Sequence, residues 1–73
     1  MVPDRRVADG VRQAVEAGGD AVLDLHVWRL GPGHLGAIVS VATEMPDRQS
    51  GHYRQLLSRF PSLSHITVEV HSR

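Results

Sequence analysis

The sequence predicts an α+β fold in which two helices cover one face of a three-stranded sheet. Two stretches carry apolar residues at helical spacing, three are rich in branched aliphatic residues, and glycine or proline stands at most boundaries between them. The order along the chain is helix, strand, strand, helix, strand. Amphipathic helices beside a sheet with one strongly apolar face favour a two-layer sandwich, in which the other sheet face lies open.

The first helix is expected from about residue 4 to residue 17. Asp4 is a good capping residue, and the apolar positions that follow it share one helical face. These positions are Val7, Val11, Ala14 and Val15. The glycine pair at 18–19 then ends the helix, because glycine just past the last periodic residue is the usual stop signal.

Two strands follow, and they most simply form an antiparallel hairpin. Residues 21–30 alternate apolar and polar side chains, and residues 35–43 are a second run rich in β-branched residues. The sequence Gly-Pro-Gly at 31–33 is a turn cluster between them.

A second helix and a last strand complete the prediction. Pro46-Asp47 predicts the start of the helix, which is expected to end near Pro61. The apolar face of this helix consists of Tyr53, Leu56, Leu57 and Phe60. Residues 66–71 alternate without interruption and are expected to form the last strand.

The whole chain, residues 1–73, is expected to be a single domain, since 73 residues are too few for a multidomain enzyme. Without cysteine there is no disulfide, thiolate ligand or cysteine nucleophile. The eight basic residues are all arginine and balance eight acidic ones, so the composition provides no basic field for nucleic acid or an anionic membrane. The apolar runs are far shorter than the roughly 20 residues that cross a bilayer. The main compositional clue is the presence of five histidines.

The open face of the predicted sheet should carry ionisable and aromatic side chains. The alternation places on it Asp24, His26, Trp28, Thr67, Glu69 and His71. Ile38 and Ser40 of the middle strand are expected to join them, although both faces of that strand are apolar enough to leave its register open. A mixed face of this kind suits a symmetric dimer interface.

Glu69 and His71 are the foremost candidate metal ligands. They stand two residues apart on a strand and therefore on one side of it, where a carboxylate and an imidazole can converge on one ion. His26 on the same face would add a third donor, with Asp24 either orienting its ring or merely exposed. The alternative is a solvated strand face. Imidazole and carboxylate ligands without thiolate favour zinc, cobalt, nickel or copper.

His52 lies near the start of the second predicted helix, outside its apolar stripe. It is a candidate ligand of a second metal site or else an ordinary exposed histidine. No catalytic site is expected, because no nucleophile-elbow pattern surrounds Ser40 and the turn at 31–33 is not followed by a helix, as a phosphate-binding loop would be. The chain is therefore not expected to be an enzyme.

Two segments resemble the cytoplasmic C-terminal domain of cation diffusion facilitator (CDF) metal transporters. Residues 24–34, Asp-Leu-His-Val-Trp-Arg-Leu-Gly-Pro-Gly-His, resemble the family's aspartate-leucine-histidine-hydrophobic-tryptophan strand. Residues 63–70, Leu-Ser-His-Ile-Thr-Val-Glu-Val, resemble its histidine-x-threonine-hydrophobic-glutamate strand. The resemblance covers nearly all of residues 4–71 and is closest to the branch associated with cobalt, nickel and zinc efflux.

The resemblance implies a metallochaperone-like (ferredoxin-like) α-β-β-α-β domain that forms a V-shaped homodimer in the cytoplasm, at the inner face of the membrane. Its implied partner is the transmembrane domain of a cation efflux transporter, and nucleic acid is not a partner. Its implied ligand is a divalent cation, with zinc first and cobalt, nickel or cadmium as alternatives, which closes the dimer and activates transport. Two other functions remain open: a metal-independent dimerisation or interaction module, and a stand-alone soluble metal-binding protein.

The family's ligand positions are only partly matched. By resemblance, Glu69 and His71 fall at ligand positions on the last strand, and His52 matches a helix-start histidine that contributes to a second site in some members. Leu23 and Ser40 stand where many members have ligand histidines. Either His26, close by on the open face, compensates for these losses, or the site is more solvated and weaker than usual.

Overall fold

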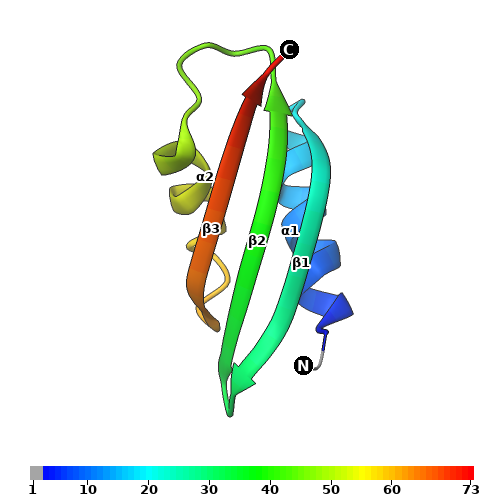
Figure 1. Cartoon of the computed structure of the whole chain (residues 1–73), viewed down its shortest axis with the longest axis vertical. Helices are drawn as coiled ribbons and strands as arrows, with labels where there is room; N and C mark the ends of the chain where they lie inside the picture. The colour runs from blue at the N-terminus through cyan, green and yellow to red at the C-terminus, as the bar shows by residue number, and fades with distance from the viewer. Residues whose placement is uncertain (1–2) are drawn as a thin grey trace.

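Five helices and strands follow one another in the predicted order. The structure, a computed structural model, describes residues 3–73. It consists of α1 (Arg5–Ala17), β1 (Ala21–Gly31), β2 (His34–Thr43), α2 (Ser50–Leu57) and β3 (Leu63–Ser72). Figure 1 shows the strands side by side with both helices on one side of the sheet. The predicted two-layer α+β architecture is therefore confirmed.

The sheet has the order β1-β2-β3, with β1 antiparallel to β2 and β2 parallel to β3. The predicted hairpin is confirmed, and its turn uses Gly33, whose φ of 73° lies in the left-handed region that favours glycine. A parallel pair needs a crossover connection, and the segment containing α2 supplies it. Both α1 and α2 pack on the same face of the sheet, and no helix among residues 3–73 covers the opposite face.

The ends of α1 agree with the predicted signals. The Asp4 side chain caps the helix, with its Oδ1 accepting a hydrogen bond from the backbone N of Val7 at 2.9 Å. Gly18 is the C-cap residue, and Gly19, with a φ of 92°, turns the chain towards β1.

The predicted start and end of the second helix are wrong. The helix begins at Ser50, not at Pro46-Asp47, and ends at Leu57, before Pro61. The preceding residues form a turn instead, in which the backbone N of Arg48 donates to the carbonyl oxygen of Met45 at 3.2 Å. The last strand is longer than predicted, since β3 already begins at Leu63.

The core lies between the helices and the apolar face of the sheet. Its largest fully buried side chains are Tyr53, Leu57, Val11, Val15, Val39 and Val41. The segment after α2 also packs closely against α1, because a Cβ atom at Gly10 of α1 would lie 2.8 Å from the ring of Phe60. Within residues 3–73, none of the helices is long and apolar enough to cross a membrane.

The segment before α1 covers part of the free edge of β1. The backbone N of Asp4 donates to the carbonyl oxygen of Val27 at 3.0 Å, and Pro3 forms an isolated antiparallel bridge with Trp28. Pairing of this kind reduces the number of free donors and acceptors on an edge strand. It also holds the start of α1 beside the hairpin end of β1, as Figure 1 shows.

Candidate metal-binding face

The uncovered face of the sheet, called the open face below, carries the side chains predicted for it. Its residues, from β1 to β3, are Asp24, His26, Trp28, Gly36, Ile38, Ser40, His65, Thr67, Glu69 and His71. The register of the middle strand, which the sequence left open, is now defined: Ile38 pairs with His26 and Ser40 with Asp24. Paired positions share a face, so both residues join the open face as expected.

Two histidine–carboxylate pairs lie on this face. On β1, Nε2 of His26 lies 3.2 Å from Oδ1 of Asp24; these two residues are called the β1 pair. On β3, Nε2 of His71 lies 3.4 Å from Oε1 of Glu69; these are called the β3 pair. All four side chains are more than half exposed, so each pair can reach a ligand from solvent or from another molecule.

The two pairs do not meet within one chain. Asp24, Ser40 and Glu69 form one row across the sheet, so β2 stands between the pairs. Neighbouring strands are about 4.8 Å apart, which separates the backbones of the two pairs by about twice that distance. In the part of the chain that the structure describes, no three histidine or acidic side chains are grouped closely enough to hold one metal ion. His26 therefore shares a face with Glu69 and His71 but does not complete a three-ligand site with them.

Ser40 and Leu23, which stand where the resemblance leads one to expect histidine, lie in different surroundings. Ser40 occupies the centre of the open face, where its Oγ donates a hydrogen bond to Oε1 of Glu69 at 3.3 Å. Leu23 falls at an irregularity in the pairing of β1 and is 57% exposed. Neither side chain supplies a nitrogen ligand, so the donors of the open face are those of the two pairs and of His65.

His52 lies away from the open face. It is exposed on α2, in the helical layer on the other side of the sheet. Its ring contacts Tyr53 edge to face, with the ring centroids 4.8 Å apart. Within one chain it is therefore not part of a site with Glu69 and His71, and its role as a ligand of a second site stays a prediction.

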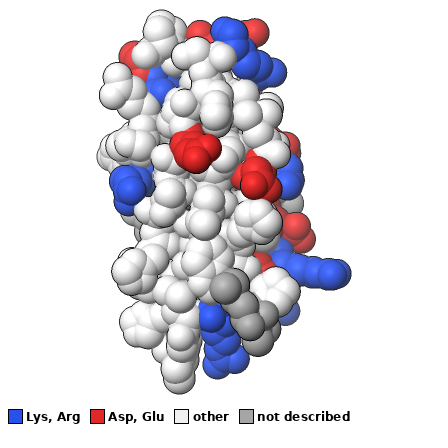
Figure 2. All heavy atoms as spheres, in the orientation of Figure 1, with Lys and Arg blue, Asp and Glu red and all other residues white. Residues whose placement is uncertain are grey.

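Figure 2 shows how sparsely charge is distributed over the open face. Acidic groups stand apart from each other on a surface of mostly uncharged side chains. Among these, Ile38 is 39% exposed, and the Trp28 indole lies over Gly36 of the neighbouring strand. A face that combines separated acids with an isoleucine and an indole is suited to burial against another protein surface.

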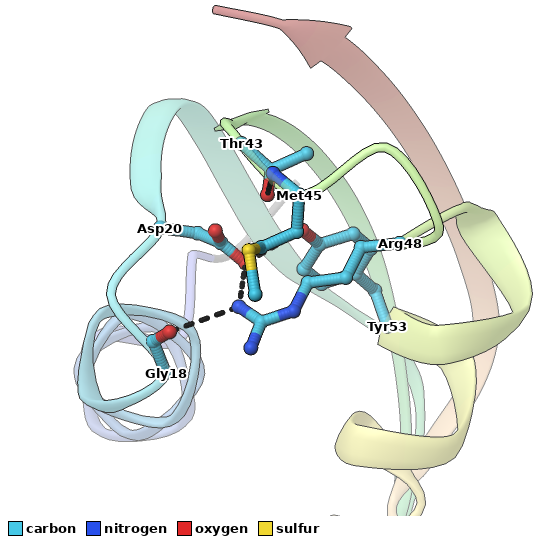
Figure 3. Close-up of polar contacts among 6 residues, drawn as sticks. All are labelled: Gly18, Asp20, Thr43, Met45, Arg48 and Tyr53. Carbon is cyan, nitrogen blue, oxygen red and sulfur yellow. Dashed lines mark hydrogen bonds and ion pairs between the residues drawn. The ribbon is translucent and has the colours of Figure 1, made fainter.

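The sequence analysis did not predict a buried polar cluster that lies at the end of the sheet away from the hairpin turn, shown in Figure 3. Oδ2 of Asp20 accepts hydrogen bonds from the hydroxyl of Tyr53 at 2.6 Å and from Nη1 of Arg48 at 2.9 Å. The same Arg48 nitrogen donates to the carbonyl oxygen of Gly18 at 2.9 Å, and Thr43 lies beside the carboxylate. The cluster thus joins the end of α1, the start of β1, the loop after β2, and α2.

Hydrogen bonding controls the charge state of this cluster. Burial on its own raises the pKa of Asp20, but hydrogen bonding by Tyr53, Thr43 and Arg48, together with the positive charge of Arg48, outweighs burial and holds that pKa below its ordinary value of 3.8. Burial, followed by the hydrogen bond to Asp20, raises the pKa of Tyr53 above 10.0. At neutral pH the carboxylate is therefore ionised and the phenol protonated, and we assign the cluster a structural role.

A signal for the cluster does exist in the sequence. Tyr53 belongs to the apolar stripe of a helix, and a buried tyrosine hydroxyl needs a hydrogen-bond partner. Asp20 follows directly after the glycine pair and precedes an apolar strand, where an unpaired carboxylate would be unfavourable. What the sequence does not reveal is that residues 33 positions apart meet there.

Comparison with solved structures defines the class of fold. The α-β-β-α-β sandwich with its β1-β2-β3 sheet has the ferredoxin-like fold of a solved C-terminal domain. A particular neighbour is the MamM C-terminal domain, solved as the nickel form of a single-residue variant. The TM-score is 0.74, the sequence identity is 14%, and the alignment covers 96% of this chain and 99% of that one. No protein-family model and no curated protein matches the sequence. The fold expected from the two sequence motifs is thus confirmed.

Proposed function

We propose that this chain is the regulatory cytoplasmic domain of a divalent-cation efflux transporter of the CDF family, lying at the inner face of the membrane. In this proposal it pairs with a second copy through the open face and binds a divalent metal ion there. The observation that carries the proposal is the presence of two exposed histidine–carboxylate pairs on the open face of this fold. The sequence motifs of residues 24–34 and 63–70 and the MamM neighbour support the family assignment.

The spacing of the two pairs explains why a second copy is part of the proposal. A zinc-like ion in a protein is held by three or four ligands, whereas each pair offers one nitrogen and one carboxylate group. Glu69 and His71 of one copy would supply half of such a site, and residues of the other copy the remainder. Because the ion then prefers the associated form, its binding free energy shifts the population towards a closed dimer. In the transporter, that change would be communicated to the transmembrane domain.

The donor set defines a class of metal ions. Imidazole and carboxylate groups suit zinc, cobalt, nickel and cadmium, and the nickel form of the MamM neighbour supports divalent metal binding by this fold. No observation favours zinc among them. His52 would contribute only to a separate site, because it lies in the helical layer. We assign the chain no catalytic role.

The test is calorimetric titration of the metal-free chain with zinc, cobalt and nickel, combined with sedimentation at each metal ratio. We expect saturable binding together with conversion of monomer to dimer. The double variant Glu69→Gln/His71→Ala should lose both, and the variant Asp24→Asn/His26→Ala reports on the β1 pair. His34→Ala, an exposed histidine at the hairpin turn, is the matched control and should behave like the wild type.

A metal-independent dimerisation module is the second candidate function. The partial exposure of Ile38 and the position of Trp28 on the open face favour it, because apolar contacts alone can hold such a dimer. Under this alternative the chain dimerises without metal, and the Glu69→Gln/His71→Ala variant dimerises equally well. Tight metal binding by a chain that stays monomeric would instead indicate a stand-alone metal-binding protein.

A further inference from the structure

Three arginines without acidic partners stand at one end of the molecule. Arg5 and Arg6 belong to the first turn of α1, which contains no acidic residue, and Arg29 lies near the end of β1. All three are exposed. Among residues 3–73, the arginines that form ion pairs within 4.0 Å are Arg12 and Arg48, both elsewhere in the fold.

Arg5 and Arg29 line two hollows that share Asp4, and Arg6 follows Arg5 in the first turn of α1. Asp4 lines one hollow together with Arg5, and a second hollow of about 260 Å³ together with Arg29 and His34. Asp4, whose carboxylate caps α1, supplies one negative charge beside three positive ones, so this part of the surface keeps a net positive charge. We call this region, formed by residues 3–6 and 29–34, the hairpin end. The lowest charged atoms in Figure 2, which lie at this end, are basic.

An exposed apolar tip adjoins these arginines. Leu30 is 47% exposed, and Pro32 in the turn is exposed as well. Together the two side chains give the hairpin tip a small exposed apolar surface. Basic groups around a small apolar tip are the combination that suits the boundary between lipid headgroups and acyl chains.

We infer that the hairpin end binds an anionic lipid surface. Arg5, Arg6 and Arg29 contact lipid phosphates, and Leu30 enters the interfacial layer. A nucleic acid would satisfy the arginines but would leave the apolar tip without a partner. The balanced charge of the whole sequence does not reveal this surface, because most of the acidic residues lie outside the hairpin end. The inference goes beyond the proposed function and requires neither metal nor dimerisation.

The experiment is co-sedimentation of the whole chain with vesicles of phosphatidylcholine, with or without phosphatidylglycerol. One variant is Arg5→Gln/Arg6→Gln/Arg29→Gln. Its matched control, Arg12→Gln/Arg54→Gln/Arg73→Gln, changes the net charge equally but leaves the hairpin end intact. Leu30→Ser tests the apolar tip, and Met45→Ser, at a residue 48% exposed in the loop after β2, is its control. Circular dichroism verifies that each variant is folded.

We expect binding to anionic but not to neutral vesicles. The hairpin-end arginine variant should reduce the partition coefficient about a hundred-fold, since each arginine near the surface contributes about a five-fold factor. Leu30→Ser should reduce it about three-fold. The arginine control should reduce it by a smaller factor than the hairpin-end variant, and Met45→Ser should leave it unchanged.

Three results would overturn the inference: no binding to anionic vesicles, equal loss in the two arginine variants, or binding unaffected by Leu30→Ser. A parallel titration with a short DNA duplex tests whether the hairpin end binds nucleic acid instead of lipid. Duplex binding that requires the three arginines and is stronger than vesicle binding would also overturn it. Because metal titration is not involved, failure here leaves the proposed function untouched.

Discussion

Asp20 shows how a charge becomes tolerable inside a small core. Its side chain is 4% exposed, and an isolated carboxylate at such a position would be strongly unfavourable. Tyr53 and Arg48 donate to the same carboxylate oxygen, from α2 and from the loop before it. The charge is thus stabilised only when α1, the sheet and α2 are all in place, so the cluster contributes to the uniqueness of the packing as well as to its stability.

Replacing Tyr53 with phenylalanine should lower the free energy of unfolding by about 1.5–3 kcal/mol, because the substitution removes a hydrogen bond to a buried charged group while keeping the ring. Urea unfolding followed by circular dichroism measures the change. Ser58→Ala is a suitable control, because its hydroxyl also makes a 2.6 Å hydrogen bond, to the carbonyl oxygen of Gln55, but in an exposed position. That control should change stability by less than about 0.5 kcal/mol. Similar small changes in both variants would contradict the structural role of the cluster.

Stability should also depend on pH through Asp20. Its folded-state pKa lies below the ordinary value of 3.8, so its contribution is fully present above that value and is lost as the pH falls through the lower folded-state pKa. The free-energy difference between the wild type and Asp20→Asn should therefore be constant near neutrality and shrink below about pH 4. Urea titrations from neutral pH downwards measure it, with Tyr53→Phe as a second variant. A difference that stays constant into the acid range would show that this carboxylate is not responsible.

Single residues also show what could be predicted before the structure. His26, Glu69 and His71 were placed on the right face by their alternation alone, because strand periodicity fixes the side on which a residue lies. Alternation does not determine how far apart two strands lie in a sheet. It could not show that β2 separates His26 from Glu69 and His71. The partners of Asp20 cannot be predicted from local sequence patterns, since they depend on contacts between residues 28 and 33 positions apart.

At the scale of elements, the start of α2 shows tertiary contacts overriding a local signal. Pro46-Asp47 is a typical helix-start pattern, but the Arg48 side chain donates hydrogen bonds to the Asp20 carboxylate and to the carbonyl oxygen of Gly18. The backbone N of Met45 meanwhile donates to Oγ1 of Thr43 at 3.1 Å, which favours a turn there. The helix begins only after these contacts. The other elements were predicted well because their capping residues and periodicity agree with the packing.

The contact between Trp28 of β1 and Gly36 of β2 predicts the effect of a single methyl group. A Cβ atom at Gly36 would lie 2.8 Å from Cζ2 of the indole, so Gly36→Ala must displace the ring. We expect a destabilisation of about 1–3 kcal/mol and a shift of tryptophan fluorescence towards longer wavelength as the ring becomes more exposed. Gly31→Ala is the control, because no atom lies within 4 Å of a Cβ atom there. An unchanged emission spectrum in Gly36→Ala would contradict the contact.

At the scale of the whole molecule, the sheet is covered on one side only. A chain of 73 residues without disulfides has a small core, so association or ligand binding adds a large fraction to its stability. The open face and the hairpin end are different surfaces, one across the strands and the other at the turn. Self-association through the first therefore leaves the second free for a membrane, and the two proposals are compatible in one molecule.

The last prediction concerns self-association through the open face. Ile38 is 39% exposed at the centre of that face, between His26 and Thr67. Ile38→Asp adds a charge that would be desolvated between two copies, so the dimer should dissociate at least ten-fold more readily while the monomer stays folded. Sedimentation velocity over a range of protein concentrations, with and without zinc, measures this, and circular dichroism monitors the fold. Met45→Asp places the same charge at a similarly exposed apolar residue in the loop after β2, and should leave association unchanged. If Ile38→Asp dimerises as well as the wild type, the copies associate through another surface and the two histidine–carboxylate pairs do not face each other.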